Sequence, residues 1–348
     1  MNLRVGELVE VRAKEDILAT LDKNGRLDGL PFMPQMFQYC GKRFTVYKRA
    51  HKTCDFVYTM SSRWLANGVH LDLRCDGAAY GGCQHDCLLF WKEAWLKRVD
   101  ERTGASAQAA SAVTIDPACT EADVLRGTTS VNSEGELIYT CQGTELPSFT
   151  SPLPWWNMRQ YVEDYTSGNA SIGRLSQGFA FALFRTVKDS GLKIGRPLRW
   201  LYDSLAGSLG FPPYPLQPGR VADGQQAPEC TLNLQPGELV RVKSYEEILA
   251  TLDKNRKNRG LLFDAELVPY CGKVFRVRSV VTRFLDEKTR KIRTVKTRCV
   301  ALESVVCESR YSHCRMICPR SILSWWREIW LERVPEGAQE SRCSGVSH

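Results

Sequence analysis

The chain has 348 residues, of which 43% are hydrophobic and 10% aromatic, a composition typical of globular domains with a sizeable core. The net charge of +8 permits an acidic partner such as nucleic acid, although such a charge also serves solubility alone. No stretch approaches the roughly 18 uninterrupted apolar residues of a membrane span, and the first residues lack the apolar run of a signal peptide, so we expect a cytoplasmic protein without a membrane span.

The opening segment of the chain recurs in its second half. Gly6 recurs as Gly237 and Cys40 as Cys271, an offset of 231 residues in both cases, and no gap is needed between them. The likeness resumes later, where three cysteines precede a segment that ends in WLKRV in the first copy and WLERV in the second. A repeat of this length predicts a duplicated module.

Each copy begins with a predicted strand and a short helix. Apolar residues alternate with charged ones over 7–12, which predicts a strand, and the next apolar residues follow a helical spacing over 14–22. In the second copy Ser244 and Glu247 form a capping box, whereas the first copy has Ala13 at the cap position. A turn at 22–25 and further strands over 42–49 and 273–280 complete the pattern.

This order of elements resembles small SH3-like barrels, and the likeness covers only the first forty residues of each copy. The phrases LDGLPFMP, YCGKRF and GGCQHDCLLFWKEAWLKRV resemble those of a family of uncharacterised bacterial cysteine-rich proteins with no assigned activity. The resemblance implies self-standing modules and adds no chemistry. The expected fold class is α+β, with two duplicated SH3-like barrel modules joined by a helical insertion.

Fourteen cysteines in a chain without an export signal are more typical of metal ligands or redox groups than of disulfides. Four thiols recur in each copy, and four thiolates can hold zinc in a closed tetrahedral site. We therefore predict two zinc sites, each with one set of ligands: Cys54, Cys75, Cys83 and Cys87 in the first copy, and Cys299, Cys307, Cys314 and Cys318 in the second.

Three alternatives stay open for these cysteines. The same thiols could hold an iron–sulfur cluster, or they could be small buried hydrophobic residues. Cys141 could replace Cys54 as a ligand. Neither copy has the two-residue CxxC spacing of zinc ribbons, and we interpret His85 and His313 as surface residues.

Tryptophans stand four residues apart near the end of each copy. The spacing predicts that Trp91 and Trp95, and likewise Trp326 and Trp330, share one face of a helical turn. We interpret both pairs as core residues that close the module beside the metal site.

The intervening chain predicts linkers and helices. The expected division is a first β module over 1–100, a linker over 101–153, a helical insertion over 154–212, a second linker over 213–231, a second β module over 232–336 and a tail over 337–348.

The second copy carries a basic hairpin that turns at 286–289. Residues 276–298 include nine basic and two acidic side chains, which could neutralise phosphates or could be a solvated surface. The candidate nucleic-acid contacts are Arg276, Arg278, Arg290, Lys291, Arg293, Lys296 and Arg298.

The sequence shows no GxSxG, GxxxxGK[ST], HExxH or GxGxxG motif. We therefore expect a non-catalytic, metal-stabilised binding or scaffold protein whose partner is a protein or a nucleic acid. The alternative is a redox accessory protein that transfers electrons through an iron–sulfur cluster or thiols.

Overall fold

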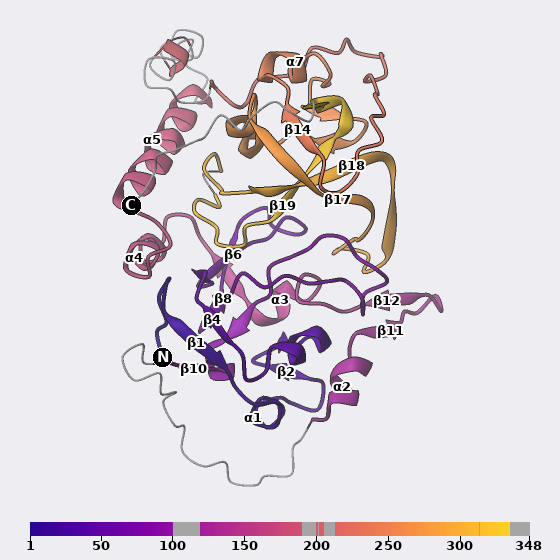
Figure 1. Ribbon diagram of the computed structural model, residues 1–348. Coiled ribbons are helices and arrows are strands. Elements are labelled where there is room, and N and C mark those ends of the chain that lie inside the picture. The colour runs from indigo at the N-terminus through magenta and orange to yellow at the C-terminus, as the bar shows by residue number, and fades with distance from the viewer. Residues whose placement is uncertain (100–118, 190–199, 201, 205–212, 313, 335–348) are drawn as a thin grey trace. The chain divides into compact units, whose positions relative to one another are not determined.

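The computed structural model describes residues 1–99, 119–189, 200, 202–204, 213–312 and 314–334. Across these residues the protein is mixed α+β with many small antiparallel sheets, none of which closes into a barrel (Figure 1). The chain divides into two compact units: unit 1 contains Met1–Tyr202, Arg283–Val295 and Val306–Leu323, and unit 2 contains the remainder. No helix in the described ranges has the length and apolar character needed to cross a membrane.

In unit 1 the first strand of the chain pairs with two partners. Strand β1 (Leu8–Val11) lies between β10 (Leu96–Arg98) and β4 (Arg43–Thr45), all antiparallel. Val9 is opposite both Arg98 and Phe44. Because alternate side chains of a strand point to one face, Val9 and Val11 are buried while their neighbours are partly exposed. The predicted first strand is confirmed.

The first strand of the second copy has the same partners. Strand β14 (Leu239–Val242) lies between β20 (Leu331–Arg333) and β17 (Val274–Leu285), and Val240 is opposite Arg333 and Phe275. The two copies therefore share one register at this point. In the second copy the strands belong to a larger, five-stranded sheet in the order β19-β18-β17-β14-β20, with β18 at Ile292–Val306 and β19 at Leu323–Arg327.

The two predicted short helices form, and their starts differ as expected. Helix α7 (Tyr245–Leu249) has the predicted capping box, because the Ser244 side chain accepts from the Glu247 N–H and the Glu247 carboxylate accepts from the Ser244 N–H. Helix α1 (Lys14–Leu18) follows Ala13, which makes no side-chain cap. Each helix is followed by a two-stranded hairpin and a 3-10 helix: β2 (Arg26–Leu27), β3 (Leu30–Pro31) and η1 (Pro34–Tyr39) in the first copy, and β15 (Lys257–Asn258), β16 (Leu261–Leu262) and η3 (Ala265–Tyr270) in the second.

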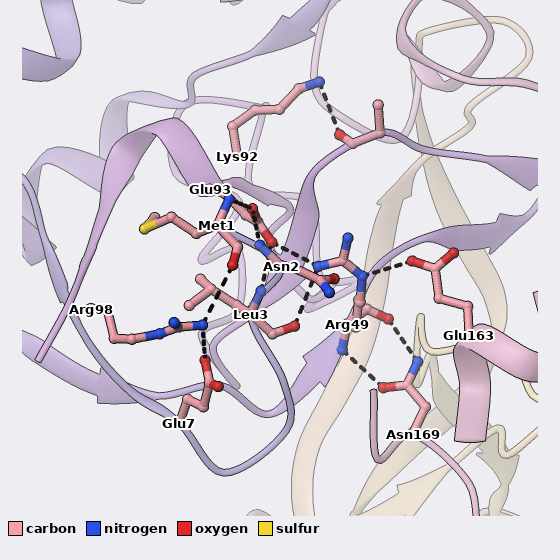
Figure 2. Close-up of polar contacts among 11 residues, drawn as sticks. Met1, Asn2, Leu3, Glu7, Arg49, Lys92, Glu93, Arg98, Glu163 and Asn169 are labelled. Carbon is pink, nitrogen blue, oxygen red and sulfur yellow. Dashed lines mark hydrogen bonds and ion pairs between the residues drawn. The ribbon is translucent and has the colours of Figure 1, made fainter. Parts of the chain in front are cut away.

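A buried glutamate fixes the entry of the chain into each copy. In unit 1 the Glu93 carboxylate accepts hydrogen bonds from consecutive N-terminal nitrogens and from a guanidinium (Figure 2). Its donors are Met1 N at 2.6 Å, Asn2 N at 2.9 Å, Leu3 N at 2.8 Å and Arg49 Nη1 at 2.7 Å. In unit 2 Glu328 has the corresponding donors: Leu232 N at 2.7 Å, Asn233 N at 3.0 Å, Leu234 N at 2.9 Å and Arg298 Nε at 2.8 Å.

The tryptophan pairs lie in the cores of the two copies, as predicted. Trp91, Trp95, Trp326 and Trp330 are all fully buried. The Trp95 indole donates to Thr20 Oγ1 at 3.1 Å, and the Trp330 indole donates to Thr251 Oγ1 at 3.0 Å. The local structure is not one continuous helical turn, because a short strand leads into a single 3-10 turn: β9 (Trp91–Lys92) and η2 (Glu93–Trp95), and β19 and η4 (Glu328–Trp330).

The remaining elements of unit 1 are short. Its other strands are β5 (Lys48–Arg49), β6 (Lys52–Cys54), β7 (Ser62–Trp64), β8 (Gly68–His70), β11 (Thr129–Val131), β12 (Leu137–Tyr139) and β13 (Ser151–Leu153). Its other helices are α2 (Glu121–Arg126), α3 (Leu146–Phe149), α4 (Arg159–Thr166) and α5 (Ile172–Asp189). Helices α4 and α5 confirm the helical prediction after 154.

Several of these elements fall where the sequence predicted a linker. Residues 119–153 hold α2, the β11–β12 hairpin, α3 and β13, and the last of these pairs with β7. The predicted positions 101–118 and 337–348, and His313, lie outside the described residues. The second copy is also shared between the units, because the tip of the β17–β18 hairpin and the cysteine segment Val306–Leu323 both belong to unit 1.

Candidate metal centre

Four cysteines of unit 1 line a single cavity. Cys75, Cys83 and Cys87 come from the long connection between β8 and β9, and Cys141 follows β12. The cavity has a volume of about 40 Å³. It can hold an ion or a water molecule, whereas drug-sized ligands occupy cavities roughly ten times larger. We call these residues the first cysteine group.

The main chain folds tightly to bring the three sequential cysteines together. The Cys75 N–H donates to the Cys87 carbonyl at 2.9 Å, beside an isolated bridge between Arg74 and Leu88. Gly77 has a φ of +72°, and a Cβ at this position would lie only 1.9 Å from the Cys83 carbonyl oxygen. Only glycine fits this close approach of two backbone segments.

Hydrogen-bond donors are directed at the sulfur atoms of this group. Gln35 Nε2 donates to Cys75 Sγ at 3.2 Å, and the Leu285 N–H donates to Cys83 Sγ at 3.2 Å. The amide two residues beyond a cysteine also donates to its sulfur in three cases: Gly77 to Cys75, His85 to Cys83 and Gly143 to Cys141. Such donors stabilise a negatively charged sulfur, whether free or bound to a metal.

The surroundings otherwise oppose ionisation of these thiols. Burial raises the pKa of Cys75 above its ordinary range, and the neighbouring sulfurs of Cys87 and Cys141 add to the effect. Burial also raises the pKa of Cys87 to about 12 and that of Cys141 to about 11. A metal cation that entered the cavity would have to displace these protons, so its binding would depend on pH.

A second cysteine group forms where the first copy meets the cysteine segment of the second. The Cys54 thiol, in β6, is hydrogen-bonded to the Cys318 sulfur, and the charge of Arg320 acts on both thiols. Cys307 also interacts electrostatically with Cys54. Ser62 is the cross-strand partner of Cys54, and Ser62 Oγ donates to the Cys314 carbonyl at 3.2 Å. We call Cys54, Cys307, Cys314 and Cys318 the second cysteine group, in which Cys314 is placed near Cys54 by its main-chain carbonyl.

The surroundings shift the pKa values of the two interacting thiols in opposite directions. Burial raises the pKa of Cys54 well above its ordinary value, and the Cys318 sulfur adds to the rise. Burial alone would also raise the pKa of Cys318, but the hydrogen bond from Cys54, together with the backbone N–H and charge of Arg320, lowers it. The surroundings of Cys318 thus favour the thiolate, the form that binds metals.

Buried cations flank the second cysteine group. Arg320 Nη1 donates to the Cys54 carbonyl at 3.2 Å, and Lys52, fully buried in β6, donates to Asp164 Oδ2 at 2.5 Å. Lys48 Nζ donates to Ser321 Oγ at 2.8 Å. Burial lowers the pKa of both lysines, and the sulfur of Cys318 opposes that shift in each case. Sequence reasoning did not identify Arg320 or Lys52, because nothing in their local sequence distinguishes them.

The observed grouping differs from the two sets predicted by spacing. Cys141 stands with Cys75, Cys83 and Cys87, while Cys54 stands with the second triplet. Cys299 lies in β18 within unit 2, where its thiol faces the Val281 carbonyl at 3.8 Å. The arginines that bind the two buried glutamates show which residues of the two copies correspond. Arg298 binds Glu328 as Arg49 binds Glu93, so Cys299 corresponds to Ala50 and not to Cys54.

The histidine predicted to be on the surface takes part in the first cavity. His85 lines it and stacks on Phe284, with the ring centroids 5.4 Å apart. In the described part of the chain, no group of three or more Cys, His, Asp and Glu side chains meets the geometry for holding a metal ion as it stands.

Most of the predicted basic contacts are engaged within the protein. In unit 1 Arg290 donates to the Tyr139 carbonyl at 3.2 Å, Lys291 pairs with Glu136, and Arg293 pairs with Asp286 at 3.3 Å. In unit 2 Arg276 donates to the Gly237 carbonyl at 2.5 Å, and Arg298 binds Glu328. Arg278 and Lys296 are exposed on the hairpin strands. At least five of the seven predicted basic contacts are thus engaged with other groups of the protein.

Comparison with protein-family models, with curated proteins and with solved structures finds no match to this chain.

Proposed function

We propose that this chain is a non-catalytic binding or scaffold protein whose first cysteine group holds a structural zinc ion. The observation that carries the proposal is the convergence of Cys75, Cys83, Cys87 and Cys141 on one small cavity. Four thiolates form the closed coordination of structural zinc sites, which leaves no open position for a substrate. Backbone amides donate to three of the sulfurs, and such hydrogen bonds orient metal ligands.

A zinc ion at this position would stabilise the long connection between β8 and β9. Between β8 and β9 the chain runs from Leu71 to Phe90 with one isolated bridge, between Arg74 and Leu88, as its sheet pairing. A connection of this length with so little regular structure needs another source of stability. Zinc would supply it by linking three points of the connection to Cys141, and the binding free energy would become folding free energy.

We further infer that each copy is an SH3-like module. Support comes from the shared register of β1 and β14 with the strands on either side, and from the matching indole–threonine and glutamate–arginine contacts. Such modules commonly serve as binding units, but the fold itself does not assign a partner.

For the partner we propose a protein in preference to a nucleic acid. Most basic side chains of the hairpin are engaged with other groups of the protein, whereas three apolar side chains shortly after β13 are exposed: Trp155 by 47%, Trp156 by 66% and Met158 by 57%. Aromatic residues and methionine are enriched in protein interfaces. The test is to change Arg278 and Lys296 to Glu. Unaltered retention on immobilised single-stranded DNA at low salt is expected, and a clear loss of retention would favour nucleic acid instead.

Metal analysis of the full chain tests the central part of the proposal. Protein purified without added metal is expected to contain zinc, and Cys141→Ser is expected to lose one equivalent of it. Cys230→Ser is the control because this thiol is exposed and belongs to neither group. Brown protein with stoichiometric iron would replace the proposal by the alternative, an electron-transfer protein with an iron–sulfur cluster. Metal-free protein of unchanged stability would reject both.

A further inference from the structure

We propose that Cys54, Cys307, Cys314 and Cys318 form a second zinc site, to which both copies contribute and which holds the cysteine segment of the second copy in unit 1. The inference rests on the proposed function only in using the same metal–thiolate chemistry. It assigns a different set of ligands, and the first site can exist without it.

Main-chain contacts bring the four residues together independently of their sulfur atoms. The Cys307 N–H donates to the Ile322 carbonyl at 2.8 Å, which closes the cysteine segment into a loop. Within that loop the Cys314 carbonyl accepts from Ser62, the cross-strand partner of Cys54. Arg320 also donates to the Cys54 carbonyl. The loop thus contacts β6 at Cys54 and β7 at Ser62.

The rest of the loop packs on unit 1 as well. Met316 and Ile317 are buried in a small apolar cluster with Tyr161 and Ala170, from α4 and the turn that follows it. In its described residues, 307–312 and 314–322, the loop contains no helix or strand. Its placement therefore depends on these side-chain contacts and on a metal ion bound by its thiols. Short segments without regular structure are commonly ordered by zinc in this way.

The electrostatic surroundings favour a negatively charged metal–thiolate centre. Zinc with four thiolates carries a net charge of about −2, from four negative sulfurs and one divalent cation. Lys52 and Arg320, both buried, lie beside Cys54 and Cys318, and the Arg320 N–H donates to the Cys318 sulfur. Binding would release the protons of the remaining thiols to solvent and would involve no change of oxidation state.

A site shared by the two copies also accounts for the lack of a cysteine equivalent to Cys54 in the second copy. In the structural correspondence set by Arg49 and Arg298, Cys54 matches Glu303 of the second copy. The second triplet has no thiol of its own at that position, and Cys54 takes this place. The first triplet, in turn, is completed by Cys141.

Zinc analysis of three serine variants tests the inference. Two equivalents are expected in the wild-type chain and one in Cys54→Ser. Cys299→Ser is the matched control, because both thiols are buried in strands, with 2% and 1% exposure, and it should keep two equivalents. Cys141→Ser should lose the other equivalent. A wild-type chain with one equivalent, lost in Cys141→Ser and kept in Cys54→Ser, would overturn the second site and leave the proposed function intact.

A measurement on the wild-type chain avoids dependence on the folding of variants. After exchange of zinc for cadmium, proton–cadmium NMR correlations should join the β-protons of Cys54 and Cys318 to one cadmium ion, and those of Cys75 and Cys141 to another. Correlations that join Cys54 to no cadmium, or a Cys54–Cys318 disulfide in the protein purified under reducing conditions, would refute the second site. Absence of any cadmium signal would refute the first site as well.

Discussion

Arg320 and Glu287 form a buried ion pair, 2.6 Å between Nη2 and Oε1, at the point where the two cysteine groups approach each other. Both residues line the first cavity, and Arg320 also contacts Cys54 of the second group. The guanidinium keeps its charge despite burial, because Glu287 and the nearby sulfurs raise its pKa. The Arg320 guanidinium therefore lies beside both cysteine groups, which together contain eight thiols.

Replacement of Arg320 by Met should destabilise unit 1 by about 3 kcal/mol, because it leaves the Glu287 carboxylate without its partner in a buried site. Urea denaturation measures the effect. Arg293→Met is the control: its ion pair with Asp286 is exposed and should contribute less than about 1 kcal/mol. Equal losses in the free energy of unfolding for the two variants would show that the buried ion pair contributes no more than the exposed one.

The Glu93 anchor predicts a dependence of stability on pH. Burial alone would raise the pKa of Glu93, but the N-terminal amino group, the Leu3 N–H and Arg49 lower it from 4.5 to about 2. Because the folded pKa lies below the unfolded one, the stabilisation is present above about pH 4.5 and is lost as the pH falls toward 2.

The comparison of wild type with Glu93→Gln measures this contribution. The difference in free energy of unfolding should be about 3 kcal/mol larger at pH 6 than at pH 2, which is 1.36 kcal/mol for each unit of pKa. Glu7→Gln, in an exposed ion pair with Arg98, should cost less than about 1 kcal/mol at pH 6. A difference for Glu93→Gln that does not change with pH would contradict the assignment.

The two copies should respond alike to removal of the hydroxyl that accepts the indole hydrogen bond. Thr20→Val and Thr251→Val each leave the N–H of a buried tryptophan without an acceptor, at a cost of about 1–3 kcal/mol. Thermal or urea unfolding of both variants checks this. A large loss of stability for one variant and none for the other would mean that the two equivalent hydrogen bonds contribute differently to stability.

His70 should remain neutral in the folded protein across the physiological range. Burial lowers its pKa to about 3, although its hydrogen bond to the Leu89 carbonyl, at 2.9 Å, acts in the opposite direction. Since the unfolded residue titrates near 6.5, stability should fall as the pH decreases below that value. NMR of the imidazole protons should show no titration between pH 8 and pH 5. A midpoint near 6 would contradict the burial of this ring.

Local features of the fold could be predicted from the sequence because neighbouring residues determine them. The capping box of Ser244 and Glu247, the alternation in β1 and the hairpin turn after Leu285 follow from spacings of a few residues. The burial of Trp95 and Trp330 could also be inferred, because a tryptophan at this spacing in both copies indicates a packing role.

Which cysteines group together depends on contacts between segments that are distant in the sequence, and the spacing of cysteines along the chain does not reveal these contacts. Cys54 meets Cys318 only because the second copy's cysteine segment folds onto β6, and Cys141 reaches the first triplet through a hairpin that appeared to be part of a linker. The sequence predicts equivalent positions for Cys54 and Cys299. The buried arginine–glutamate pairs instead align Cys54 with Glu303, and Cys299 lies four residues before that position.

The most direct test of the account is a titration of the reduced, metal-free full chain with Co²⁺, followed by visible absorption. Cobalt bound to four thiolates in a tetrahedral site gives intense bands that a site with oxygen or nitrogen ligands does not give. The account predicts that these bands grow until two equivalents are bound and that zinc then removes them. Weak bands, or no bands at any ratio of metal to protein, would contradict the assignment of the two cysteine groups as metal sites.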